Sequence, residues 1–188
     1  PVYIYGSRED HIVPIGGAYA STQVLPGKKR FVMGASGHIA GVINAPDEQG
    51  FITGNVTGTA QVMAAAQRAN IQRFIHVSSL AAREPALSAY GRSKAQSETL
   101  LQASALDWTI VRPPAVYGPG DRETLELYRM AKHRVVMLPP GGRLSLIEAG
   151  DLARLLLRLI DAPASIGALY EPDDGRSGGW AHDEFARC

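Results

Sequence analysis

Two side chains capable of acid–base chemistry stand one helical turn apart in the middle of this 188-residue chain. Tyr90 and Lys94 are separated by four positions in a segment that predicts a helix, so both side chains lie on one face. A tyrosine ordinarily loses its proton near pH ~10, and a neighbouring ammonium group favours the phenolate. The pair could therefore exchange a proton with a substrate oxygen closer to neutral pH.

A serine that follows an apolar run could complete this arrangement. Ser78 and Ser79 come directly after Val77, and a hydroxyl there could hydrogen-bond the same substrate oxygen as Tyr90. A Tyr-x-x-x-Lys spacing by itself is weak evidence in a chain with seven tyrosines, because it can arise by chance. The surrounding segments therefore decide its meaning.

Those segments carry a family resemblance. Residues 55–59 read Asn-Val-Thr-Gly-Thr, and residues 112–120 read Arg-Pro-Pro-Ala-Val-Tyr-Gly-Pro-Gly. Together with Ser79, Tyr90 and Lys94 they resemble, from about residue 51 onward, an NAD(P)-dependent epimerase/dehydratase, one of the extended short-chain dehydrogenases/reductases.

The resemblance implies roles for these positions. Tyr90 would be the acid/base, Lys94 its electrostatic activator and ribose anchor, and Ser79 the partner of the substrate oxygen. The residues expected to contact NAD or NADP are Asn55, Lys94, Pro113 and Val116. Arg143 could meet a substrate phosphate or be an ordinary surface arginine, and Asp151 is expected to cap a helix.

The elements that must position these residues alternate between helical and strand patterns. Such alternation predicts an α/β fold with a mainly parallel, truncated Rossmann-like sheet and helices on both faces. The predicted helices are residues 57–69, 89–103, 122–132 and 151–160, and the predicted strands are residues 73–77, 108–112, 135–137 and 144–147.

The first part of the chain has a different character. Apolar runs at residues 2–5 and 30–33 predict strands, and Gly34, Gly37 and Ala40 fit the glycine-rich turn of a dinucleotide fold. Only residues 42–54 separate Gly41 from Asn55, whereas a single βαβ unit needs roughly 30 residues. We therefore expect this loop not to open a nucleotide-binding helix, although a true nucleotide loop remains the alternative.

Residues 1–46 resemble instead the C-terminal part of the α/β-hydrolase domain of a class I polyhydroxyalkanoate synthase. That resemblance implies that Asp10 orients His38, which would deprotonate a cysteine nucleophile. The nucleophile is expected upstream of residue 1, and Cys188 has none of its sequence context. The acid–base pair of a hydrolase remnant is one interpretation of Asp10 and His38, and an ordinary turn aspartate and loop histidine are the other.

The sequence thus predicts a chimera, with residues 1–46 as the synthase-like fragment and residues 47–188 as an epimerase/dehydratase-like domain lacking its pyrophosphate loop. We expect oxidoreductase chemistry on a small hydroxyl or keto substrate, with nucleotide sugars as one class. NAD or NADP binding is expected to be weak or absent. The alternatives are an acyltransferase remnant without its cysteine and a non-catalytic fragment.

Composition narrows the partners and the compartment. The 19 basic and 18 acidic residues give no electrostatic case for nucleic acid or a membrane surface, and no apolar run reaches the length of a membrane span. The single cysteine excludes an intramolecular disulfide and a cysteine-based metal site, so a cytoplasmic location and no metal are expected. The sequence does not indicate an oligomeric state.

Overall fold

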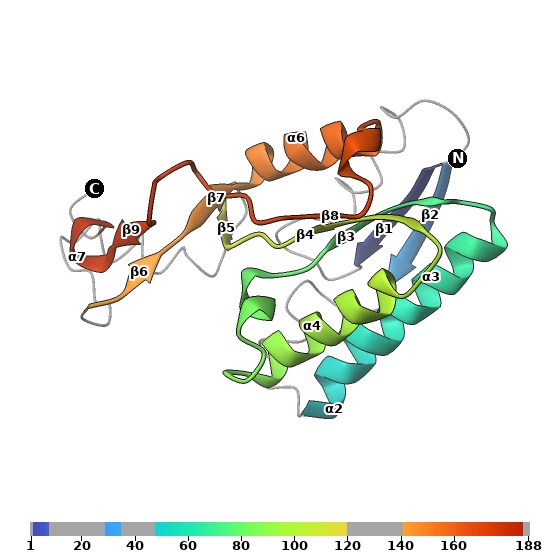
Figure 1. The fold of residues 1–188 in the computed structure, drawn as a ribbon, viewed down its shortest axis with the longest axis horizontal. Helices are drawn as coiled ribbons and strands as arrows, with labels where there is room; N and C mark the ends of the chain where they lie inside the picture. The colour runs from blue at the N-terminus through green and yellow to red at the C-terminus, as the bar shows by residue number, and fades with distance from the viewer. Residues whose placement is uncertain (1, 8–28, 35–47, 120–140, 186–188) are drawn as a thin grey trace.

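The computed structural model describes residues 2–7, 29–34, 48–119 and 141–185 (Figure 1). The strands are β1 (Val2–Ser7), β2 (Lys29–Gly34), β3 (Arg73–Val77), β4 (Asp107–Val111), β5 (Ala115–Tyr117), β6 (Arg143–Leu144), β7 (Leu146–Glu148), β8 (Ala168–Tyr170) and β9 (Trp180–Ala181). The helices are α2 (Glu48–Phe51), α3 (Gly58–Arg68), α4 (Ala89–Gln102), α6 (Ala149–Ile160) and α7 (His182–Phe185), with a π-helical turn, η1 (Ile52–Thr57), and two 3-10 turns, η2 (Leu80–Arg83) and η3 (Pro163–Ser165).

The central sheet is parallel. Strands β3, β4 and β8 lie side by side in that order, and β1 pairs with β2 and β5 with β7, also in parallel. Strands β6 and β9 form a short antiparallel pair. Helices α3 and α4 lie on one side of the central sheet and α6 on the other (Figure 1), which confirms the predicted α/β class with helices on both faces.

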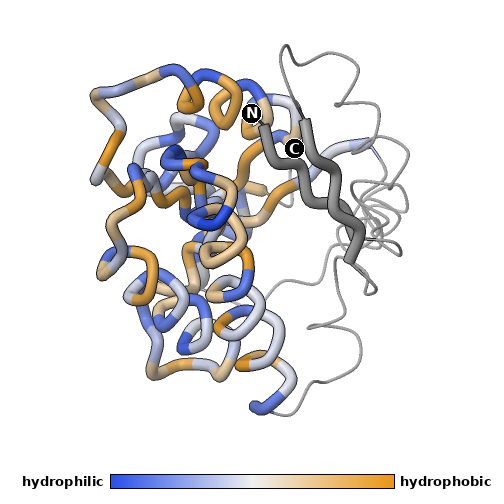
Figure 2. The backbone as a smooth tube through the Cα atoms, turned by 90° about the vertical axis from the view of Figure 1, so that its right-hand side faces the viewer, coloured by the Kyte–Doolittle hydropathy of each residue, from blue (hydrophilic) through white to orange (hydrophobic). Residues whose placement is uncertain are grey.

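Alternation along the strands divides the apolar side chains between two cores. On β3, Phe74 packs with Ile110 and Leu101 against α3 and α4, whereas the next residue, Ile75, packs with Val111 and Leu152 against α6. Successive side chains of a strand point to opposite faces, so each strand contributes to both cores. Figure 2 shows hydrophobic stretches interspersed with hydrophilic ones along the described backbone.

The helix before β3 is longer than predicted. Elements α2, η1 and α3 run without a break, because the residues at both junctions, Phe51 and Gly58, have α-helical backbone angles. The helix ends at Asn70, whose φ is 54°, with Asn70 N–H donating to the Gln67 carbonyl and Ile71 N–H to the Ala66 carbonyl. This Schellman ending explains why the helix stops where the sequence predicted.

The cap of α6 differs from expectation. Glu148, not Asp151, is the N-cap residue, and its carboxylate accepts a hydrogen bond from the Asp151 backbone N–H at 3.1 Å. Asp151 lies in the first turn and pairs with Arg154. The expectation for Asp151 was wrong because the helix begins two residues earlier than predicted, at Ala149.

Several predictions lie outside the described residues. These are the helix at residues 122–132, the strand at residues 135–137, the loop after Gly34, and the side chains of Asp10, His38 and Cys188.

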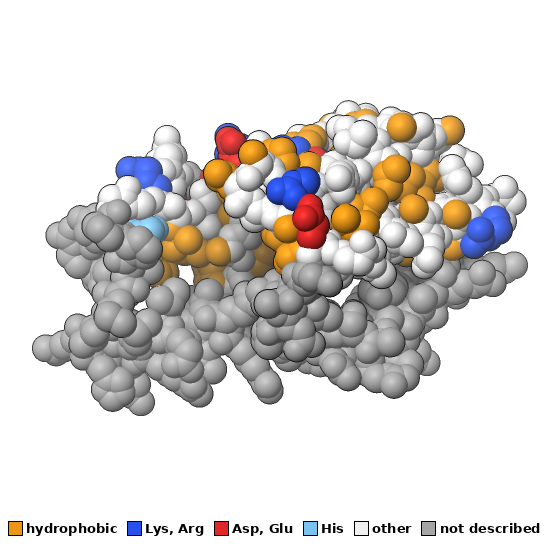
Figure 3. Space-filling model, turned by 90° about the horizontal axis from the view of Figure 1, so that it is seen from below, with side chains coloured by type: hydrophobic (Ala, Val, Ile, Leu, Met, Phe, Trp, Pro, Cys, Tyr) orange, Lys and Arg blue, Asp and Glu red, His pale blue; other side chains and the backbone are white. Residues whose placement is uncertain are grey.

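Among the helices that the structure describes, none is long and apolar enough to cross a membrane. On the described part of the face in Figure 3, lysine and arginine side chains are scattered singly among apolar ones.

Candidate active site

Helix α4 presents Tyr90 and Lys94 together. The helix begins at the Ser88 cap, whose hydroxyl accepts a hydrogen bond from the Gly91 backbone N–H at 2.9 Å, so Tyr90 lies in its first turn. The Lys94 Nζ lies 5.9 Å from the centroid of the Tyr90 ring. The ring also packs against Phe51 at 5.6 Å between centroids. The pair that the four-residue spacing predicted therefore shares one helix face.

The segment carrying Ser79 leaves the carboxyl end of β3 and packs on the first turn of α4. Ser79 caps η2, and its hydroxyl oxygen accepts a hydrogen bond from the Ala81 backbone N–H at 3.2 Å. Among the described residues, none accepts a hydrogen bond from the Ser79 hydroxyl. Gly91 permits the close packing, because a Cβ there would lie 2.5 Å from the Ala81 carbonyl oxygen.

Lys94 is half-buried beside the end of β3. Its ammonium donates to the Val77 carbonyl at 3.4 Å. Burial lowers the pKa of Lys94, and the carboxylate of Glu98 acts in the opposite direction. Burial and the Lys94 charge lower the pKa of His76 to about 4, so this histidine, 3.0 Å from the Ser97 hydroxyl, is neutral at pH 7.

Asn55 reaches helix α4 from the π-helical turn. Its Nδ2 donates to the Ser93 hydroxyl at 2.9 Å, and that hydroxyl donates to the Tyr90 carbonyl at 2.8 Å. Asn55 thus holds the backbone of Tyr90 through Ser93. A π-helical turn often marks a functional site, because it changes the direction of the side chains that it carries.

The proline-rich loop after β4 touches the Ser79 segment. The buried Pro113 accepts a hydrogen bond on its carbonyl oxygen from the Leu80 N–H at 3.0 Å. Val116, on β5, is half-buried and packs its side chain against the core that contains Ile147. The structure therefore places Pro113 next to the serine, and directs the Val116 side chain into the protein.

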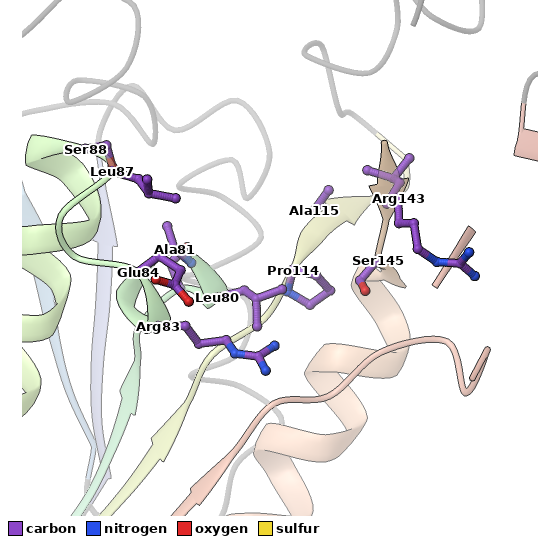
Figure 4. A pocket seen from close by; sticks show the side chains of 12 residues that line it. Leu80, Ala81, Arg83, Glu84, Leu87, Ser88, Pro114, Ala115, Arg143 and Ser145 are labelled. Carbon is purple, nitrogen blue, oxygen red and sulfur yellow. Dashed lines mark hydrogen bonds between the residues drawn. The ribbon is translucent and has the colours of Figure 1, made fainter. Parts of the chain in front are cut away.

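An open cleft of about 640 Å³ begins at Ser79 (Figure 4). Turn η2 forms one side, Pro114 and Ala115 lie in the middle, and β6 with Ser145 forms the other side. Tyr90 and Lys94 are not among its lining residues. Arg143 lines the cleft, but its guanidinium donates to the carbonyls of Gly178 and, at 2.9 Å, Gly179. This bonding favours a structural role for Arg143 over phosphate recognition.

A buried ionic group beneath the site was not predicted from the sequence. Glu98 is 3% exposed and pairs through both carboxylate oxygens with Arg112. Glu98 does follow Lys94 by four residues, so the helical spacing that singled out Tyr90 and Lys94 continues to it. The arginine lies in the segment that carried the family resemblance, but its partner could not be read from that segment.

These residues fit a nicotinamide dinucleotide on chemical grounds. Ligands of parallel α/β sheets bind beyond the carboxyl ends of the strands, where Ser79 and Pro113 follow β3 and β4. Lys94 keeps two N–H groups without an acceptor among the described residues, and a ribose offers hydroxyl oxygens to such donors. Lys94 would therefore be the group that holds the ribose.

Comparison with known families agrees with this chemistry. A family described as NAD(P)H-binding matches residues 24–163. The chain belongs to this family. It is 42% identical over 152 residues to a ceramide reductase from Caulobacter vibrioides, which covers 80% of this chain and 47% of the relative. The chain thus spans about half the length of that relative.

A solved structure shares the Rossmann-like fold. MoeE5 in complex with UDP-glucose and NAD superposes with a TM-score of 0.67 at 18% identity, covering 93% of this chain and 76% of that one. At this identity the likeness shows the fold alone. The NAD(P)H-binding family nevertheless establishes NAD or NADP as the cofactor class.

The beginning of the chain has a second relationship. A poly(3-hydroxyalkanoate) polymerase subunit, PhaC, from Cupriavidus necator is 76% identical over 46 residues, which is 24% of this chain and 8% of that protein. This match confirms the predicted chimera of a synthase-like segment and an NAD(P)H-binding body. The family match begins at residue 24, within the synthase-like segment, so the boundary at residues 46 and 47 stays a prediction.

Proposed function

We propose that this chain is an NAD(P)-dependent oxidoreductase that interconverts a hydroxyl and a keto group on a small molecule. The observation that carries the proposal is the shared face of α4, where the Lys94 ammonium lies 5.9 Å from the Tyr90 ring, on the helix against which the Ser79-capped turn η2 packs. An acid, a cation that supports its ionised form and a hydroxyl donor are the groups needed for proton exchange with a substrate oxygen.

The proposed roles follow from the chemistry of each group. In the reductive direction the Tyr90 hydroxyl gives its proton to the carbonyl oxygen, while the carbonyl carbon receives a hydride. The bound nicotinamide supplies that hydride. Ser79 donates a hydrogen bond to the same oxygen and orients it. The Lys94 charge stabilises the tyrosinate that remains, and Asn55 holds the Tyr90 backbone through Ser93.

The substrate that the cleft favours is amphipathic. Beyond Ser79 its lining includes Leu80, Leu87 and Leu144, and Leu87 is 81% exposed. An exposed leucine at the rim of a cleft suits an acyl chain better than a sugar. The ceramide reductase supports the same choice through its 42% identity. A nucleotide sugar is the second candidate, because the Arg83 guanidinium also lines the cleft.

Hydride transfer to a defined ketone tests the proposal. In one reaction, a short-chain ceramide whose hydroxyl has been oxidised to a ketone is mixed with NADH or NADPH. In a parallel reaction, UDP-glucose is mixed with NAD. The absorbance of the reduced nicotinamide follows both reactions. Tyr90→Phe should slow the reaction about 10²–10⁴-fold. Tyr170→Phe is the matched control, because it removes a phenol hydroxyl from β8 and should change nothing. Equal rates in the two variants would refute the role of Tyr90.

We also propose that cofactor affinity is weak. The support is the 76% identity of a 46-residue segment to a polymerase, because that segment has polymerase-like sequence instead of a recognised pyrophosphate-binding unit ahead of Asn55. Hydrogen bonds to a charged group contribute about 1.5–3 kcal/mol each, so the loss of two or three lowers affinity by several powers of ten. Calorimetric titration with NAD, NADP and their reduced forms is the measurement, and a micromolar dissociation constant would contradict the proposal.

An acyltransferase activity is the alternative function. The polymerase-like segment carries Asp10 and His38, and a cysteine thiolate is the nucleophile that such a pair activates. We expect no release of coenzyme A from 3-hydroxybutyryl-coenzyme A. Release that disappears in both His38→Ala and Cys188→Ser would establish the alternative.

A further inference from the structure

A buried carboxylate outside the proposed triad joins the elements that carry it. The Ser78 hydroxyl donates to Glu98 Oε1 at 2.5 Å. Arg112 donates from Nε to the same oxygen at 2.9 Å and from Nη2 to Oε2 at 2.6 Å. Both carboxylate oxygens are therefore engaged, and the guanidinium also reaches Glu171 at 3.1 Å. A charge at 3% exposure persists only when it is paired in this way.

Each partner in this group is adjacent to a residue of the site. Ser78 precedes Ser79, and Arg112 precedes Pro113. Glu98 lies one helical turn beyond Lys94 on α4. The group thus connects the end of β3, the catalytic helix and the end of β4.

The backbone hydrogen bonds made by Ser78 and Arg112 do not reach helix α4. Ser78 N–H donates to the Val111 carbonyl at 2.7 Å, and Arg112 N–H donates to the Tyr170 carbonyl at 2.8 Å. These bonds join strands to strands. The side chain of Glu98 accepts hydrogen bonds from both Ser78 and Arg112, so it links α4 to the ends of β3 and β4 together, whereas the Lys94 ammonium reaches only the Val77 carbonyl of β3.

We propose that Glu98 is a positioning residue that holds Ser79 and the Pro113 loop against the face of α4 carrying Tyr90 and Lys94. The inference rests on the function proposed above. An apolar side chain packed at position 98 could stabilise the fold equally well. It could not, however, orient the two hydrogen-bond donors, Ser78 and Arg112, that follow β3 and β4.

The same carboxylate acts on the lysine. The titratable and charged groups around Lys94 are Tyr90 and Glu98 on α4, His76 on β3 and, paired to Glu98, Arg112 at the end of β4. Glu98 brings a negative charge to this set and raises the pKa of Lys94 against the effect of burial. Removal of the Glu98 charge should therefore lower the pKa of Lys94.

The test uses the full chain and needs neither cofactor nor turnover. Lysine labelled with ¹³C at Cε is incorporated, and the Lys94 signal, assigned with Lys94→Arg, is titrated by NMR. In Glu98→Gln its midpoint should fall by at least about 0.5 pH unit, because a nearby opposite charge is lost. Amide hydrogen exchange should accelerate in residues 78–83 and 115–117 and not elsewhere.

Asp151→Asn is the matched control. Asp151 is an exposed carboxylate on α6 that pairs with Arg154, so its loss removes the same charge away from the site. It should leave both readouts unchanged. An unchanged Lys94 midpoint in folded Glu98→Gln, or accelerated exchange spread over the whole chain, would overturn the inference.

A second variant keeps the inference testable if Glu98→Gln does not fold. Ser78→Ala removes one donor and leaves the ion pair with Arg112 intact. It should accelerate exchange in residues 78–83 while the Lys94 midpoint stays in place, and unchanged exchange would overturn the inference. A failed turnover assay in the unsubstituted chain would refute the proposed function without touching either result.

Discussion

Replacing Ser78 by alanine isolates the contribution of one hydrogen bond to a buried charge. The Ser78 side chain is 5% exposed, and its hydroxyl donates to Glu98 at 2.5 Å. A hydrogen bond to a charged group contributes about 1.5–3 kcal/mol. Glu98 keeps both bonds from Arg112, so no unpaired charge remains. The expected loss in the free energy of unfolding is therefore at the lower end, about 1.5–2 kcal/mol.

Urea unfolding followed by tryptophan fluorescence measures this loss, because Trp108 packs against the core of the central sheet. In a chain of this size the same loss lowers Tm by about 3–8 °C. Ser104→Ala is the control, since its hydroxyl has only neutral partners, donating to the Leu101 carbonyl at 2.7 Å and accepting from the Leu106 N–H at 3.3 Å, and its loss should cost only about 1 kcal/mol. An equal loss in the two variants would refute the claim that the charge on Glu98 makes the difference.

Two further perturbations test the packing and the electrostatics of the site. Gly91→Ala should destabilise the chain by about 1–3 kcal/mol, because its Cβ would lie 2.5 Å from the Ala81 carbonyl oxygen. In Gly58→Ala the added Cβ would lie 3.7 Å from its nearest neighbour, so this substitution should instead stabilise α3 by up to about 1 kcal/mol. Urea unfolding measures whether each substitution raises or lowers the free energy of unfolding. The pKa of His76 falls on folding from 6.5 to about 4, so between these values the unfolded chain binds a proton that the folded chain does not. Stability should fall as the pH is lowered through this window, by up to about 3 kcal/mol, and His76→Gln should lose that part of the slope in urea titrations at pH ~7, ~6 and ~5. A His76→Gln slope equal to that of the parent would contradict the assignment.

Local patterns were sufficient for two strands of the central sheet, β3 and β4, and for helix α4, whereas the third strand, β8 (Ala168–Tyr170), was not predicted. The apolar run at residues 73–77 became β3 with the predicted bounds, and the helix predicted at residues 89–103 became α4 (Ala89–Gln102). Such segments can be predicted because the period of side-chain alternation is set by the backbone itself. The shared face of Tyr90 and Lys94 follows from the same geometry, because four positions make about one turn of a helix.

Cap and turn chemistry was harder to predict. The sequence favoured Asp151 as the cap of α6, but the backbone enters the helix at Glu148. Glu148 and Asp151, three positions apart, can each serve as a cap, and local sequence does not fix the exact residue at which a helix begins. The π-helical turn at Ile52–Thr57 likewise had no signal in the spacing of apolar residues.

The sequence by itself thus determined the α/β class, the helix that carries the proposed acid–base pair and the two family relationships. Tertiary structure decided what surrounds that pair. Ser78 and Arg112 meet Glu98 across 20 and 14 positions of the chain, and Asn55 meets Ser93 across 38. Contacts at these separations depend on how strands and helices pack, and no local periodicity encodes them. For that reason the residues of the proposed triad could be predicted from their spacing together with the family resemblance, whereas the buried carboxylate that joins their supporting elements emerged only from the folded chain.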